Sequence, residues 1–96
     1  MVYTAASIES FVDDMNGALS KADCPRRVFI MFSDASSSFF SCIAYRVQHV
    51  KHEDDSLFFY NDRSEVVAEV ELGELGDGYR LDWDSRSGFT VFFHHA

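Results

Sequence analysis

The sequence predicts an α+β fold, in which a single N-terminal helix packs on an antiparallel meander sheet of five or six strands. An early stretch repeats apolar residues every three or four positions, as an amphipathic helix does. Later stretches alternate apolar and polar residues, as half-buried strands do. Turn-forming residues separate these stretches at 61–64, 73–78 and 85–88. A length of 96 residues, 47% of them hydrophobic, predicts one domain over residues 1–96.

The helix is expected over residues 4–22. Thr4 suits an N-cap, and Pro25 cannot continue the helix. The side chains that share one face, and that we expect to cover the sheet, are Ile8, Phe11, Val12, Met15 and Leu19.

Residues 38–50, SFFSCIAYRVQHV, predict a central strand. This stretch has no Gly, Pro or acidic residue, and both of its alternating faces are apolar until Arg46 and Gln48. We therefore expect Cys42 to lie in the core. Residues 27–32 are apolar at 28–32 and predict a neighbouring strand that is covered on both faces.

Four further strands are expected at residues 57–60, 65–72, 79–84 and 89–94. In the second of these, the apolar side chains at 66, 68, 70 and 72 oppose Glu65, Glu69 and Glu71. In the third, those at 79, 81 and 83 oppose Arg80, Asp82 and Asp84. Strict alternation of this kind predicts one buried face and one acidic face in water.

The net charge of −8 lies entirely in the second half of the chain. Residues 1–52 hold five acidic and five basic side chains, whereas residues 53–96 hold eleven acidic and three basic ones. Direct binding to nucleic acid depends on Lys and Arg, so this composition argues against it. It also argues against binding to anionic membranes and favours a protein partner with a basic surface.

Two cysteines, Cys24 and Cys42, are too few for a disulfide scaffold. We expect reduced thiols, with one inter-strand disulfide as the alternative. The first residues lack the basic start and apolar core of a signal peptide, and no apolar run is long enough to span a membrane. Together these features predict a cytoplasmic protein.

No motif identifies a catalytic or cofactor site, and we expect a protein that is not an enzyme. The serines around Asp34 lack a nucleophile elbow, and Cys24 has no histidine near it in sequence. His49, His52 and the acids at 53–55 have the side-chain types of a metal site. Because these residues follow one another closely, we expect them to form a solvated turn, with a metal site as the alternative.

The acidic face is the candidate partner-binding site. Carboxylates two apart on a strand are about 6.6 Å apart, similar to successive phosphates along a DNA strand. A surface that serves only solubility is the alternative. The aromatic anchors Tyr60 and Tyr79 complete the predicted contact residues, which are Glu65, Glu69, Glu71, Glu74, Asp77, Asp82, Asp84, Tyr60 and Tyr79.

The function predicted from these observations is that of a small acidic inhibitor, which docks on a basic, nucleic-acid-binding surface of another protein and can mimic DNA. Phage anti-defence proteins such as anti-CRISPRs, and immunity proteins against nuclease toxins, are similar in general character, being short, acidic and free of catalytic motifs. The alternative is a non-catalytic assembly module that self-associates through edge strands or exposed aromatic residues.

Overall fold

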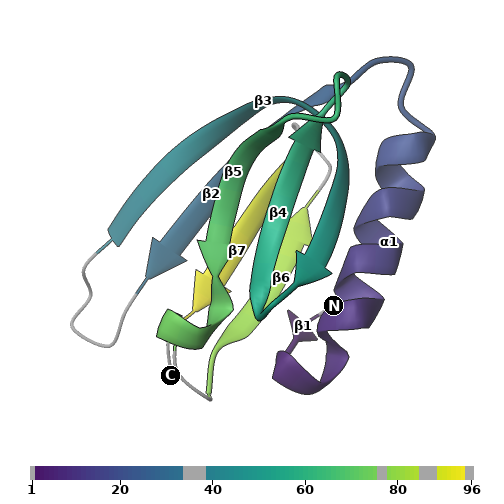
Figure 1. Ribbon diagram of the computed structural model, residues 1–96. Coiled ribbons are helices and arrows are strands. Elements are labelled where there is room, and N and C mark those ends of the chain that lie inside the picture. The colour runs from purple at the N-terminus through teal and green to yellow at the C-terminus, as the bar shows by residue number, and fades with distance from the viewer. Residues whose placement is uncertain (1, 34–38, 76–77, 85–88, 95–96) are drawn as a thin grey trace.

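The computed structural model describes residues 2–33, 39–75, 78–84 and 89–94, which form one helix packed on one mixed sheet (Figure 1). The helical elements are the 3₁₀ turns η1 (Ala5–Ser7) and η2 (Leu72–Leu75) and the helix α1 (Ile8–Ser20). The seven strands among the described residues are β1 (Val2–Tyr3), β2 (Arg26–Ser33), β3 (Phe39–Glu53), β4 (Ser56–Asn61), β5 (Val66–Glu71), β6 (Arg80–Asp84) and β7 (Phe89–His94).

The α+β class and the single N-terminal helix are confirmed, whereas the antiparallel meander of five or six strands is wrong. The sheet has seven strands in the order β1-β6-β7-β2-β3-β4-β5. After β5 the chain crosses to the other side of the sheet, where β7 pairs with β2 in parallel and β6 pairs with β1. A strand of two residues such as β1 is too short to show a periodic pattern, which explains why the expected count was too low.

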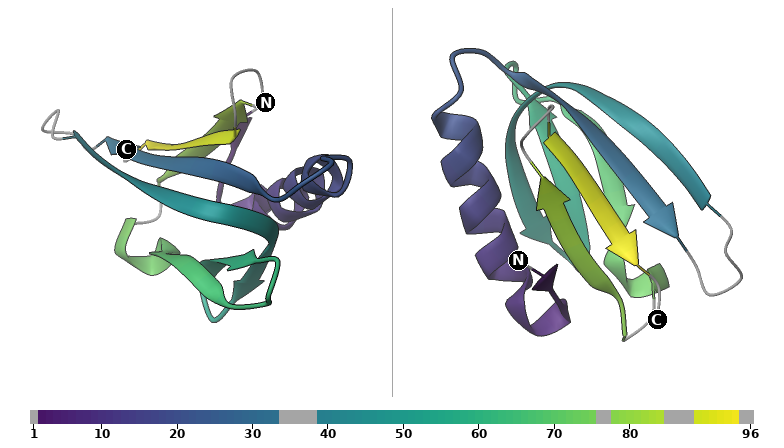
Figure 2. Two further views of the ribbon diagram at one scale, coloured as in Figure 1. Left: turned by 90° about the horizontal axis from the view of Figure 1, so that it is seen from above. Right: turned by 180° about the vertical axis from the view of Figure 1, so that it is seen from behind.

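The sheet is strongly curved, so that β6 and β7 at one end lie across the interior from β4 and β5 at the other (Figure 2). The long strand β3 joins the two ends. Its register shifts between Arg26 and Val28 of β2 and again between Val47 and His49, and Arg46 has a positive φ of 58°. Bulges of this kind increase twist and bend a strand.

The core lies between the concave face of the sheet and α1. The five apolar side chains predicted to line the helix are all buried, with Phe11 and Met15 completely inaccessible. They share one core cluster with side chains from six strands and η2, chiefly Val28, Ile30, Val47, Val50, Leu57, Phe59, Val70, Leu72, Leu81, Val91 and Phe93.

Asn16 attaches α1 to the second half of β3. Beyond Val47, β3 has no pairing with β2, because β2 begins at Arg26. The Asn16 Nδ2 group donates to the carbonyl oxygen of Val50, and Asn16 Oδ1 accepts from the Val50 N–H, both at 2.8 Å. The amide thus replaces a neighbouring strand at a buried residue.

Three predictions about β3 and its neighbours are wrong. The face of β3 that carries Ile43 and Tyr45 is open to water, with exposed fractions of 42% and 60%. Cys42 is exposed rather than in the core; it and Cys24 are free thiols. Because β3 continues to Glu53, His49 and His52 lie on a strand and not in a turn.

Candidate functional site

Six carboxylates gather where the β3–β4 turn meets the end of β5, and we call this group the acidic corner. Strand register brings them together: Glu53 is opposite Ser56, and Ser56 is opposite Glu71. The Leu72 N–H donates to the carbonyl oxygen of Asp55 at 2.9 Å, which joins η2 to the turn. The members of the acidic corner, all exposed, are Glu53, Asp54, Asp55, Glu69, Glu71 and Glu74.

The turn that supplies two of these carboxylates is built on a tight hairpin. Asp54 and Asp55 have positive φ angles of 51° and 60°. Two consecutive left-handed residues match the twist of a two-residue hairpin, and Asp is one of the residues that accept this conformation. The turn therefore holds two acidic side chains beside β5.

Like charges crowd one another within the acidic corner. A hydrogen bond to the Glu74 carboxyl raises the pKa of Glu71, and the negative charges of Glu74 and Glu69 raise it further. The Ser56 hydroxyl donates to Glu69 Oε2 at 3.4 Å. None of the ion pairs found among the described residues involves a member of the acidic corner.

Aromatic side chains lie beside the acidic corner on the convex face of β4. The register places Phe58 between Lys51 on β3 and Glu69 on β5. Tyr60 stacks on His49 with ring centroids 4.7 Å apart, and the Lys51 ammonium lies 5.3 Å from the Tyr60 ring centroid. Burial, and then the nearby charge of Lys51, lower the pKa of His49.

The structure brings together only part of the predicted contact set. Glu69, Glu71 and Glu74 belong to the acidic corner, and the half-buried Tyr60 lies near it on β4. Asp82 and Asp84 lie on β6, which four strands separate from β5, so the two groups are not on neighbouring strands as expected.

Two other predicted contact residues are not available to the acidic corner. Tyr79 is only 4% exposed, and burial is the main cause that raises its pKa. Its ring is part of the core and cannot serve as an exposed anchor. Asp77 lies outside the described residues.

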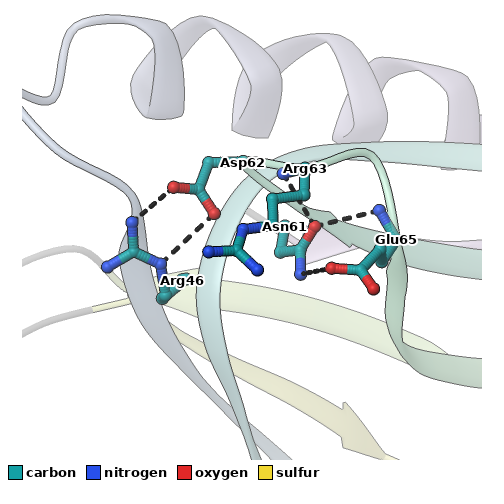
Figure 3. Close-up of polar contacts among 5 residues, drawn as sticks. All are labelled: Arg46, Asn61, Asp62, Arg63 and Glu65. Carbon is teal, nitrogen blue, oxygen red and sulfur yellow. Dashed lines mark hydrogen bonds and ion pairs between the residues drawn. The ribbon is translucent and has the colours of Figure 1, made fainter.

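Glu65 belongs to the β4–β5 turn, where Asn61 organises the backbone (Figure 3). Asn61 Oδ1 accepts the N–H groups of Arg63 and Glu65, both at 2.9 Å, and Asn61 Nδ2 donates to Glu65 Oε1 at 3.0 Å. Asp62 forms an ion pair with Arg46 of β3, and the Arg46 hydrogen bond lowers the pKa of Asp62. Glu65 therefore has a structural role in this turn, at the end of β5 away from the acidic corner.

The convex face of β2, β7 and β6 carries a Ser–His–Asp arrangement that sequence reasoning missed. Ser33 Oγ lies 3.5 Å from His94 Nδ1, and His94 Nε2 lies 3.5 Å from Asp82 Oδ2. A nucleophile and its base are usually about 2.6–3.2 Å apart. The His94 and Asp82 side chains are 42% and 38% exposed, so water competes for both contacts. Only the pairing of β7 with β2 and β6 could have revealed this arrangement.

The histidines considered for a metal site do not converge. His52 Nδ1 lies 2.7 Å from Glu9 Oε1 of α1, whereas His49 stacks on Tyr60 on the convex face. Among the described residues, no group of three or more His, Cys, Asp or Glu side chains is placed to hold a metal ion. What sequence reasoning missed is that the acids at 53–55 join the acids of β5.

Comparisons with protein-family models, with curated proteins and with solved structures find no match to this chain. Among the described residues, no helix has the length and apolar character that crossing a bilayer requires. The acidic corner is the group of exposed charged side chains on which a function can be proposed.

Proposed function

We propose that the protein is a small inhibitor that docks its acidic corner on a basic surface of another protein, in the manner of toxin-immunity or phage anti-defence proteins. The observation that carries this proposal is the crowding of six exposed carboxylates that have no ion-pair partner among the described residues. Crowded like charges are unfavourable in the free protein, as the raised pKa of Glu71 indicates. A cationic partner would relieve this repulsion.

The spacing of the carboxylates supports a partner that binds nucleic acid. Glu69 and Glu71 are two residues apart on β5, a separation of about 6.6 Å that is close to the distance between successive phosphates of a DNA strand. Mimicry of this kind would extend along β5 and η2 only, because Asp82 and Asp84 lie elsewhere. The partner's Arg and Lys side chains would meet carboxylates where they otherwise meet phosphates.

The test compares two charge-reversed variants. In the first, Glu69, Glu71 and Glu74 are changed to Lys; in the control, Asp82 and Asp84 on β6 are changed to Lys. Immobilised wild-type protein captures partners from a host lysate, and the captured protein is then purified and its binding measured over a salt series. We expect salt-sensitive binding that only the first variant loses, and inhibition of the partner's nucleic-acid binding by the wild type. Equal binding by all three proteins would contradict the proposal.

Self-association is the second candidate, and the apolar convex face favours it. Ile43 and Tyr45 on β3 are 42% and 60% exposed, and Met31 and Phe92 on β2 and β7 are half-buried. Val2, at the β1 edge of the sheet, is 56% exposed. Analytical ultracentrifugation separates the two candidates. A dimer that Tyr45→Ser disrupts, together with salt-insensitive partner capture, would favour the assembly module over the inhibitor.

A further inference from the structure

The β5 strand is the last strand at one end of the sheet and has an outer edge. β5 pairs with β4 on one side and is the last strand in the order, on the side of β4 away from α1 (Figure 1). The free part of β3 has its backbone groups at Val50 satisfied by Asn16. Among the described strands, none pairs with the outer edge of β5. An edge of this kind presents N–H and C=O groups to an added strand.

The register determines which backbone groups face outward. The Leu72 N–H points toward β4, since it donates to Asp55. Backbone direction alternates along a strand, and the register is regular from Ala68 to Glu71. The N–H and C=O groups of Val70 and Ala68 therefore face β4, whereas both groups of Glu69 and the N–H of Glu71 face outward. The Glu71 C=O accepts the first hydrogen bond of η2. The two residues that present backbone to an added strand also carry carboxylates of the acidic corner.

We propose that the edge of β5 binds an extended segment of a partner protein as an additional antiparallel strand, with basic residues opposite Glu69 and Glu71. This proposal rests on the proposed function and specifies its binding mode. Residues directly opposite one another have Cβ atoms about 4.5–5.5 Å apart on the same face of a sheet. The segment would thus carry Lys or Arg at two positions separated by one residue. The intervening side chain would lie beside the buried Val70 and would be apolar.

Charge excludes the simplest competing occupant, which is a second copy of this chain. Pairing of β5 with β5 would place glutamates of one copy against the acidic edge of the other. Like charges across strands are destabilising, and charged side chains on an edge strand oppose self-pairing. The same carboxylates stabilise a basic strand, so the edge selects its partner by charge.

The probe is a capped peptide, acetyl-Thr-Val-Lys-Val-Arg-Val-Thr-amide, titrated into the full-length protein and followed by amide NMR shifts. We expect shifts centred on β5 and η2. Two N-methylated peptides provide the matched test. In the first peptide, the backbone amides of Lys and Arg are methylated, which removes the N–H groups that would face β5. In the second peptide, the backbone amide of the central Val is methylated, which removes an N–H group that would point away from β5. The first is expected to weaken binding by about tenfold or more, and the second is expected to leave it unchanged.

A charge exchange tests the side chains separately from the backbone. The variant with Glu69→Lys and Glu71→Lys is expected to lose its binding to the basic peptide. The same variant is expected to bind a peptide that has Glu in place of Lys and Arg. Equal binding of both N-methylated peptides, or no binding of any peptide, would overturn the strand-addition proposal. A different result would contradict the proposed function. That result is a purified partner that binds equally well when Glu69, Glu71 and Glu74 are changed to Lys.

Discussion

The two ends of the curved sheet carry carboxylates in different settings. At the β5 end, six carboxylates of the acidic corner crowd together, and the pKa of Glu71 is raised by its acidic neighbours. At the β6 end, Asp82 lies 3.5 Å from His94, and Arg80 precedes it on the same strand. The difference shows that charge counted along the sequence does not indicate which carboxylates lie close together. The strand order determines which of these charges become neighbours.

The largest effect is expected in the hydrophobic core, which the two ends of the sheet share. Phe11 is fully buried between α1 and the sheet. Phe11→Ala should lower the free energy of unfolding by about 3–5 kcal/mol through lost burial and a residual cavity. Chemical denaturation monitored at Trp83, near the β6 end, and by backbone circular dichroism should show one shared, shifted transition. The exposed neighbour Ser10→Ala is the control, and two separate transitions would contradict a common core.

Asn16→Ala should affect the two ends unequally. The substitution leaves the buried N–H and C=O groups of Val50 without their partners, at a cost of about 2–4 kcal/mol in unfolding free energy. Because Asn16 holds the half of β3 that pairs with β4, hydrogen exchange should accelerate in β3, β4 and β5 more than in β6 and β7. Asn16→Asp keeps the acceptor for the Val50 N–H but places a carboxylate oxygen against the Val50 carbonyl oxygen, so it should also be destabilising. Uniform acceleration across the sheet would show that Asn16 does not hold this end in particular.

Sequence periodicity was sufficient to predict which side chains of α1, β6 and β7 point into the core. The stripe from Ile8 to Leu19 is buried as expected, and Leu81, Val91 and Phe93 point inward as their alternation predicts. Both patterns depend on neighbours within one element, so they can be read without knowing the partner strands. The Val66 side chain is 50% exposed despite its predicted inward position, because the register shifts between Phe59 and Tyr60 opposite it.

Long-range pairing could not be predicted in the same way. Nothing within residues 72–79 indicates that the chain crosses from β5 to the far end of the sheet, and the separation of Asp82 from Glu71 follows from that crossing. The apolar character of residues 38–45 indicated burial on both faces, yet Tyr45 is exposed because none of the elements that the structure describes covers the convex side of β3. Periodicity reports that a residue is apolar but does not report whether a second layer covers it.

Charge reversal measures the difference between the two ends directly. Reversal of Glu69, Glu71 and Glu74 to Lys should slow association with a basic partner by about tenfold or more at low salt, because steering depends on local charge. Reversal of Asp82 and Asp84 should have a much smaller effect, since these residues lie on β6, which four strands separate from β5. Stopped-flow association rates over a salt series provide the measurement. Slowing in proportion to the charge that each variant reverses, six units against four, would mean that only net charge matters.

The titration of Glu71 should be visible in the pH dependence of binding. Its pKa is raised above the ordinary 4.5 in the free protein, chiefly by the hydrogen bond with Glu74. A cationic partner favours the ionised carboxylate and lowers this pKa, so binding should release a proton and strengthen as pH rises through the titration of Glu71. Glu74→Gln should lower the pKa of Glu71 and flatten this dependence, whereas Glu53→Gln should leave it in place. Carboxyl ¹³C shifts follow the titration, and an unchanged Glu71 in Glu74→Gln would contradict the assigned cause.

The smallest effect is expected at the β6 end, where His94→Asn removes the contacts to Ser33 and Asp82. Both contacts are 3.5 Å long and half open to water, so the free energy of unfolding should change by less than about 1 kcal/mol. Binding to a basic partner should not change, because the acidic corner lies at the other end of the sheet. A fluorophosphonate probe should leave Ser33 unlabelled, since the Ser33 hydroxyl is farther from the imidazole than an activated nucleophile is from its base. Labelling of Ser33 that His94→Asn and Asp82→Asn both abolish would reverse the comparison, placing chemistry at the β6 end and leaving the acidic corner as a solubilising surface.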